Sequence, residues 1–257
     1  MKTTSQFIKY NDQIIPKPVG TDYDLIPGKV YSLERDKYCD DLYLREDKDF
    51  EFPEKYYLGD KDTRFINKIV HTFGNTNKLT TGVLLSGLKG SGKTLMAKKI
   101  AITSTLPIIV VSQNVNASEI EPFFAKISTD VCVIFDEIDK YWNARYLLGF
   151  LDGVKPSCKK LVLCTCNDEE EIDEYLNDRC SRIRYKKSFE CLTKDVIEGI
   201  MNDILPNKDK AKSATEFIFN SIEVVSYDNV VMFAEEVKNN PSDTYESILE
   251  DMNIEKR

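Results

Sequence analysis

The segment GLKGSGKT, residues Gly87–Thr94, decides the fold of this 257-residue chain. It matches the phosphate-binding (Walker A) pattern GxxxxGK[ST], and it stands between an apolar run, GVLLS, and a helix-forming run, TLMAKKIAI. In this setting the glycines let the backbone curl so that successive N–H groups point at a phosphate, and the start of the following helix adds partial positive charge. The segment therefore predicts a strand, a loop and a helix that together bind the phosphates of a nucleotide.

The side chains of this loop have separate expected roles. Lys93 supplies a mobile positive charge for the β- and γ-phosphates, and the hydroxyl of Thr94 is an expected ligand of Mg²⁺. A glycine-rich turn without a ligand is the alternative, which the agreement of motif and setting disfavours. The residues expected to contact the nucleotide are the loop and the residue after it: Gly87, Leu88, Lys89, Gly90, Ser91, Gly92, Lys93, Thr94 and Leu95.

Acidic and amide side chains follow two further apolar runs. VCVIF is followed by Asp136 and Glu137, a Walker B pattern, and the carboxyl end of a buried strand is where open α/β sheets bind their ligands. We expect Asp136 to hold Mg²⁺ and Glu137 to act as general base on the attacking water. The run KLVLCTC ends in Asn167, whose amide could orient the same water, although an Asn at the end of a strand is often only a turn former.

The pattern along the chain predicts an α/β fold in three parts. Residues 59–189 alternate apolar runs with helical periodicity, which is typical of a parallel sheet flanked by helices, here a P-loop NTPase core. Residues 1–58 are a β-rich segment with a hairpin over 27–47 that leads into the core, and residues 190–257 form a small helical lid. The expected N-caps of the lid helices are Thr193, Ser213, Ser226 and Ser242.

Composition restricts the classes of function. A net charge of −8 argues against a general nucleic-acid-binding protein, because the field of the whole molecule repels phosphate backbones. No apolar run is long enough to span a membrane, and the N-terminus lacks the pattern of a secretion signal. The seven cysteines form no CxxC pair, which is typical of a reducing compartment. We therefore expect a cytoplasmic protein without membrane association.

The three motifs in this order, followed by a helical tail, resemble the AAA+ ATPases over about residues 60–240. The segment LLGFLDGV, residues 147–154, is similar to the LL-x-x-LDG segment of the AAA clade. The resemblance implies ATP and Mg²⁺ as ligands, hydrolysis of ATP to ADP and phosphate, and a ring or partial ring. In such an assembly each nucleotide lies between neighbouring subunits.

The basic segment NDRCSRIRYKK, residues 177–187, follows Asn167 at the position of the family's arginine fingers. Its R-x-x-R spacing resembles the AAA clade, and DRC is similar to the SRC box of clamp loaders. Both resemblances select Arg179 as the finger, and the first alone adds Arg182. We expect Lys186 and Lys187 to be solvated.

Two departures from the family limit the resemblance. The stretch between the second and third apolar runs lacks the aromatic-apolar-Gly pore loop of threading unfoldases, and Phe123 and Phe124 there are expected in a packed helix. The lid has no arginine where the family often places a second sensor, near Asn229 and Val230. The resemblance implies a homo-oligomer that remodels a protein substrate or complex, with or without an adaptor. The alternative is a DNA-metabolism ATPase of the clamp-loader or helicase-loader type, associated with DNA.

Overall fold

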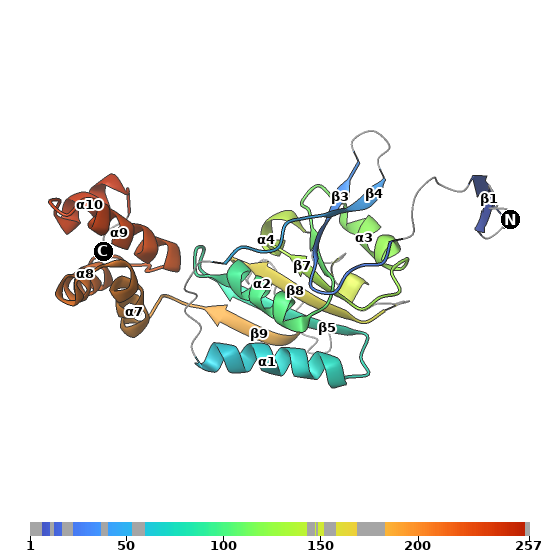
Figure 1. Cartoon of the computed structure of the whole chain (residues 1–257), viewed down its shortest axis with the longest axis horizontal. Coiled ribbons are helices and arrows are strands. Elements are labelled where there is room, and N and C mark those ends of the chain that lie inside the picture. Colours follow the sequence, from blue (N-terminus) through green and yellow to red (C-terminus); the bar gives the residue numbers. More distant parts are fainter. Residues whose placement is uncertain are drawn as a thin grey trace.

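The computed structural model describes residues 7–10, 13–16, 23–36, 41–52, 60–142, 147, 149–151, 158–168 and 183–254. An α/β body occupies the centre of the molecule, with a group of helices at one end and a small two-stranded sheet near the N-terminus at the other (Figure 1). That small sheet pairs β1 (Phe7–Tyr10) with β2 (Gln13–Pro16) in antiparallel fashion.

The body is built on a seven-stranded sheet in the order β4-β3-β6-β7-β8-β5-β9. Every pairing is parallel except that of β3 with β4. All residues of β7 and β8 are buried, which explains why these strands appear in the sequence as continuous apolar runs. The strands are β3 (Val30–Arg35), β4 (Leu42–Glu46), β5 (Thr80–Gly87), β6 (Ile108–Val111), β7 (Val131–Phe135), β8 (Lys160–Cys166) and β9 (Ile183–Phe189). The predicted parallel sheet flanked by helices is confirmed.

Helices cover both faces of this sheet. Helices α1 (Asp60–Asn75) and α2 (Lys93–Ser104) pack on one face, where Ile69 and Ile100 are fully buried. Helices α3 (Ala117–Phe124) and α4 (Ile138–Tyr141) lie against the other face.

The aromatic core of the second face includes the only tryptophan of the chain. Trp142 packs edge-on against Phe135, with ring centroids 5.3 Å apart. Phe124 is fully buried in the same cluster, and Phe123 is partly buried against it. The expectation that both phenylalanines pack in a helix is confirmed.

The hairpin predicted before the core is β3–β4, with Leu33 opposite Leu44. It does not merely lead into the core, because β3 also pairs with β6 in parallel, from Val30 opposite Ile108 onward. Leu33 is fully buried in the same cluster as Phe135. A domain boundary near residue 58 stays a prediction, but the main sheet runs across it.

Strand β9 forms the other edge of the sheet and was not predicted. Its exposed Arg184 and Lys186 alternate with half-buried side chains, so the segment carries no apolar run. Lys187 is ion-paired to Asp62 of α1 at 2.6 Å, which makes the expectation of a solvated Lys187 wrong, whereas Lys186 is exposed. Arg179 and Arg182 lie outside the described residues.

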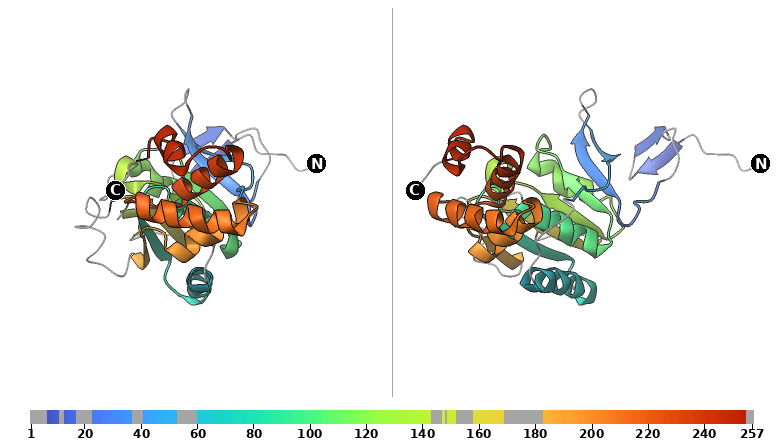
Figure 2. Two further views of the ribbon diagram at one scale, coloured as in Figure 1. Left: turned by 90° about the vertical axis from the view of Figure 1, so that its left-hand side faces the viewer. Right: turned by 60° about the vertical axis from the view of Figure 1, so that its left-hand side comes forward.

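The C-terminal helices lie together as a group (Figure 2). They form a separate core in which Phe233 and Leu249 are fully buried. The helices are α7 (Lys194–Ile204), α8 (Lys208–Ser221), α9 (Tyr227–Asn239) and α10 (Tyr245–Asp251). Within the described part of the chain, no helix combines the length and the apolar content that crossing a bilayer requires.

Two of the predicted N-caps in the lid are wrong. The side chain of Asn207 accepts two backbone N–H bonds and starts α8 before Ser213, and Thr244 rather than Ser242 caps α10. Ser226 caps α9 as expected by accepting the N–H of Asn229 at 3.2 Å. Thr193 stands at the start of α7, but its side chain makes no capping bond.

Candidate active site

The loop between β5 and α2 curls through three glycines with positive φ: Gly87 at 117°, Gly90 at 71° and Gly92 at 93°. At Gly87 a Cβ atom would collide with the carbonyl group of Phe189, whose oxygen accepts the N–H of Leu88 at 3.1 Å. Only glycine fits this position, because both the backbone angle and the close approach of β9 exclude a side chain. The end of β9 therefore holds the loop in its curled form.

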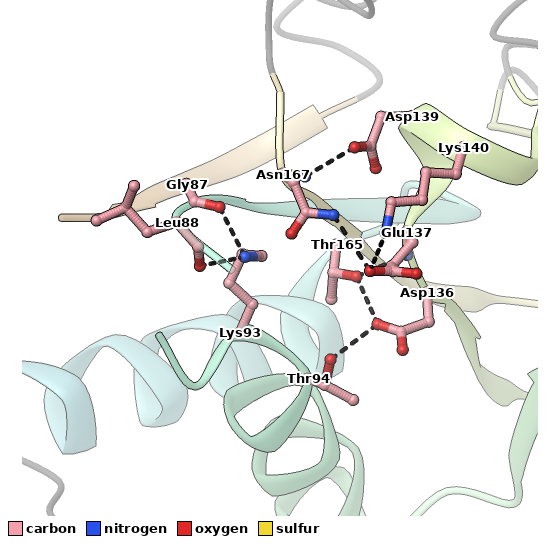
Figure 3. Close-up of polar contacts among 10 residues, drawn as sticks. All are labelled: Gly87, Leu88, Lys93, Thr94, Asp136, Glu137, Asp139, Lys140, Thr165 and Asn167. Carbon is pink, nitrogen blue, oxygen red and sulfur yellow. Dashed lines mark hydrogen bonds and ion pairs between the residues drawn. The ribbon is translucent and has the colours of Figure 1, made fainter. Parts of the chain in front are cut away.

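Lys93 lies inside the curl of this loop. Its Nζ donates to the carbonyl oxygens of Gly87 and Leu88, each at 2.6 Å (Figure 3). Burial lowers the pKa of Lys93. The hydroxyl of Ser91 is buried and has no hydrogen-bond partner among the described residues. A buried cation bonded only to carbonyls, beside an unsatisfied hydroxyl, fits a loop shaped for an anionic phosphate group.

The carboxylate of Asp136 is held between two threonine hydroxyls. Its Oδ1 accepts from Thr94 Oγ1 at 2.9 Å and from Thr165 Oγ1 at 2.5 Å (Figure 3). Within the described residues, no three side chains of the usual ligand types gather around one point. The hydroxyl of Thr94 and the carboxylate of Asp136 are hard oxygen donors, and Mg²⁺ typically takes one or two protein ligands beside phosphate oxygens. These two residues fit that role.

Thr165 holds Glu137 as well as Asp136, and the sequence analysis did not predict a role for this threonine. Its Oγ1 accepts the backbone N–H of Glu137 at 2.9 Å, so a single buried hydroxyl links Asp136 to Glu137. The only indication of this role in the sequence is a hydroxyl side chain near the end of the apolar run, two positions before Asn167. Recognising its role requires the register of β8 against β7.

Glu137 is held in place by two donors on one oxygen. Lys140 Nζ and Asn167 Nδ2 donate to its Oε1 at 2.7 and 3.2 Å. The hydrogen bond from Lys140 is the main reason why the pKa of Glu137 is lowered. The backbone of Glu137 has φ 50°, an uncommon value for a residue with a side chain. The carboxylate is thus ionised, aimed and restrained before any substrate arrives.

Asn167 is fixed at both its backbone and its side chain. Its N–H donates to Oδ2 of Asp139 at 3.1 Å, while its amide reaches Glu137. Asp139 therefore has a structural task that its sequence position alone, a turn after a strand, did not reveal. The predicted neighbourhood of Glu137 and Asn167 is present in the structure.

One cavity of about 450 Å³ is lined by several of these groups, namely Lys93, Thr94, Glu137, Thr165 and Asn167. A second cavity of about 410 Å³ shares Ser91, Gly92, Leu95 and Tyr227 with it, and its walls include the apolar side chains of Met96, Phe189, Leu192 and Val196. The first cavity carries the cationic and hydroxyl groups of the glycine loop, and the second adds apolar side chains next to charged ones such as Lys61 and Asp62. This combination suits the phosphates of a nucleotide in the first cavity and its base in the second. The described residues thus form both a cavity for the phosphates and a cavity for the base.

The lid reaches this site without an arginine, through the first turn of α9 next to the position where the family often places a second sensor. Tyr227 and Asp228, at the start of α9, line the 450 Å³ cavity, whereas Asn229 and Val230 do not. Val230 is fully buried within the lid. The predicted fingers Arg179 and Arg182 lie outside the described residues.

Comparison with known proteins agrees with this geometry. Residues 83–188 match the model of the ATPase family associated with various cellular activities (AAA). The ATP-dependent zinc metalloprotease YME1L1 of Homo sapiens is 31% identical over 123 residues, which are 38% of this chain and 16% of that protein. The ATP-dependent zinc metalloprotease FtsH 3 of Conexibacter woesei is 28% identical over 127 residues, 38% of this chain and 17% of that protein.

A third relative is named for a different process. The putative cell division cycle ATPase of Plasmodium falciparum is 34% identical over 118 residues, which are 37% of this chain and 10% of that protein. The matched part of this chain thus spans less than a fifth of the length of these relatives. The 257 residues contain a single histidine, so the zinc-binding pattern HExxH, which needs two, is not among them.

We predict that Thr165→Val lowers the free energy of unfolding by about 1–3 kcal/mol, because the Glu137 N–H and the Asp136 carboxylate both lose their bond to this hydroxyl. Thr165→Ser keeps the hydroxyl and should recover most of the loss. Denaturant unfolding without nucleotide, followed by the fluorescence of Trp142, measures both variants. Equal stabilities for the Val and Ser variants would show that the hydroxyl does not hold the site together.

Proposed function

We propose that this chain, an AAA+ ATPase by its match to the AAA family model over residues 83–188, hydrolyses ATP as an oligomer in order to remodel a protein substrate or complex. The observation that carries this proposal is the contact of Asn167 with Glu137, in the same cavity as Lys93 and close to Asp136. A chain that bound ATP only as a structural ligand would have no need for an aimed base and an amide beside it. The relatives named as ATP-dependent metalloproteases support a protein rather than a nucleic acid as the substrate.

The residues divide the chemistry between binding and proton transfer. Lys93 and the N–H groups of the glycine loop bind the phosphates, and Thr94 and Asp136 would hold Mg²⁺. The bound ion neutralises charge on the phosphate oxygens. Glu137 accepts a proton from the attacking water, and Asn167 orients that water. Lys140 keeps Glu137 ionised, since its hydrogen bond lowers the pKa of the carboxyl group.

Remodelling in this proposal does not depend on threading a polypeptide past an aromatic loop. Between β6 and β7, Phe124 is fully buried and Phe123 packs against the core. The force would then be delivered by movements of the subunits or of the lid, which contacts the nucleotide cavity directly.

We further propose that each active site is completed by Arg179 of a neighbouring subunit, with Arg182 as a second candidate. A guanidinium group is always charged, and finger arginines contribute on the order of 10³–10⁵ in rate by stabilising charge on the transferred phosphoryl group. The family resemblance supports this role. A single subunit would accordingly hydrolyse ATP slowly.

A DNA-metabolism ATPase of the loader type is the second candidate, and one surface favours it. Exposed basic side chains follow α1 and the adjacent edge strand β9, which lie side by side through the bonds of Lys187 to Asp62 and of Tyr185 to Thr72 (Figure 1). These exposed residues are Lys61, Arg64, Lys68, Arg184 and Lys186. They give a local basic surface on an acidic chain, where a phosphate backbone could bind.

The base assignment is tested by Glu137→Gln, which keeps the shape of the side chain and removes its basicity. We expect ATP affinity to stay within about threefold while turnover falls roughly 10²–10⁴-fold. Titration with ATP and a phosphate-release assay measure the two quantities. Glu235→Gln, an equivalent change on the exposed face of α9, is the control and should leave both unchanged. Turnover at the unaltered rate in the Glu137→Gln variant, under every assembly condition, would falsify the assignment.

The shared site is tested by mixing two inactive chains. Arg179→Ala should bind ATP normally and hydrolyse it at least about tenfold more slowly, and Lys93→Ala should fail to bind it. In mixed assemblies some intact sites form from a normal pocket on one chain and a normal finger on the other, so we expect partial recovery of turnover. If size analysis shows that the two chains co-assemble and turnover does not recover, each site is complete within one subunit.

The loader alternative is tested by adding DNA to the ATPase assay at about 50 mM and about 200 mM salt. If DNA is the partner, it should stimulate turnover at low salt, the stimulation should fade at the higher salt, and Arg184→Gln with Lys186→Gln should abolish it without changing the basal rate. If neither single-stranded nor duplex DNA changes ATP turnover at either salt concentration, the loader alternative is wrong and only the protein-remodelling proposal remains.

A further inference from the structure

The lid touches the glycine loop through the first turn of α9. The backbone N–H of Asp228 donates to the carbonyl oxygen of Gly90 at 3.2 Å, which places the start of this helix directly on the loop. Ser226 caps the same helix, so the position of Asp228 is fixed by the helix as well as by the loop. This contact connects two parts of the chain that have separate cores.

The carboxylate of Asp228 packs against the same glycine. A Cβ atom on Gly90 would lie 2.8 Å from Oδ2 of Asp228, so this side chain covers the space that any residue other than glycine would fill. Lys89, Gly90 and Asp228 line both the 450 Å³ cavity and another cavity of about 500 Å³ beneath the lid. The carboxylate is thus part of the wall between the two cavities.

No partner neutralises this charge in the described part of the chain. The side chain of Asp228 forms no hydrogen bond or ion pair there, Lys89 is exposed, and Lys93 is bonded to loop carbonyls. A negative group therefore faces the loop that binds the most negative part of a nucleotide. Each additional phosphate on the ligand increases the repulsion. Asp228 is exposed, so solvent screens this repulsion and its effect on the relative affinities is moderate.

We propose that Asp228 is a specificity-determining residue that disfavours a nucleoside triphosphate relative to a diphosphate while the lid rests on Gly90. The proposal rests on nucleotide binding at the glycine loop, as proposed above. Binding of ATP then works against the contact between Asp228 and Gly90, whereas ADP leaves it in place. Loss of the γ-phosphate would allow the lid to return to the loop.

The test compares the affinities for ADP and for a slowly hydrolysed ATP analogue in variants at this position. Asp228→Asn keeps the shape and removes the charge, and we expect it to shift the preference toward the triphosphate by about threefold at low salt. Asp228→Ser is a second neutral variant that suits the first turn of a helix and should shift it in the same direction. Asp228→Glu keeps the charge and should keep the preference, as should the control Glu235→Gln. The shift should be larger when Mg²⁺ is withheld, because the ion screens the phosphates.

Hydrogen exchange gives a readout that does not depend on turnover. In the unaltered chain the Asp228 amide should exchange faster with the ATP analogue than with ADP, and Asp228→Asn should remove that difference. An unchanged ratio of affinities in both neutral variants, with both nucleotides still bound, would overturn this inference alone. Failure of the unaltered chain to bind either nucleotide would overturn the proposed function and this inference with it.

Discussion

The site depends on the hydrogen-bonded register between β7 and β8. Phe135 lies opposite Cys164, so the residues that follow, Asp136 and Thr165, emerge next to each other at the carboxyl edge of the sheet. The 2.5 Å bond between their side chains follows from that alignment. A slip of one residue would turn the side chains of one strand to the opposite face and separate the carboxylate of Asp136 from the hydroxyl that holds it. The buried apolar residues of both strands make such a slip costly.

The glycine loop is positioned by packing from outside itself. Phe189 at the end of β9 closes against Gly87, and Asp228 of the lid closes against Gly90. The two glycines have different neighbours, one in the sheet and one in the lid. The glycine loop is therefore in contact with both the edge strand β9 and the lid helix α9. A change in the conformation of the loop would alter its contacts with both elements.

Local patterns in the sequence predicted the part of the site that each strand carries by itself. The glycine loop, the pair Asp136–Glu137 and Asn167 each follow an apolar run, and the ends of parallel strands meet at one edge. Thr165 was missed because its role exists only across two strands. Strand β9 was missed because an edge strand with one solvated face has no continuous apolar run. Two other features could not be predicted from local patterns, because they depend on contacts between distant segments. Strand β3 pairs with β6 across the boundary predicted near residue 58, and α9 contacts the glycine loop through Asp228.

The position of Trp142 has a practical consequence. The only indole of the chain packs against Phe135, the residue that immediately precedes Asp136, for which we propose a role in holding Mg²⁺. The indole emission therefore reports on one place, the aromatic core beneath the carboxyl edge of the sheet, and no dye has to be attached. Stopped-flow fluorescence on the unlabelled protein can therefore time events at this edge separately from those in the lid.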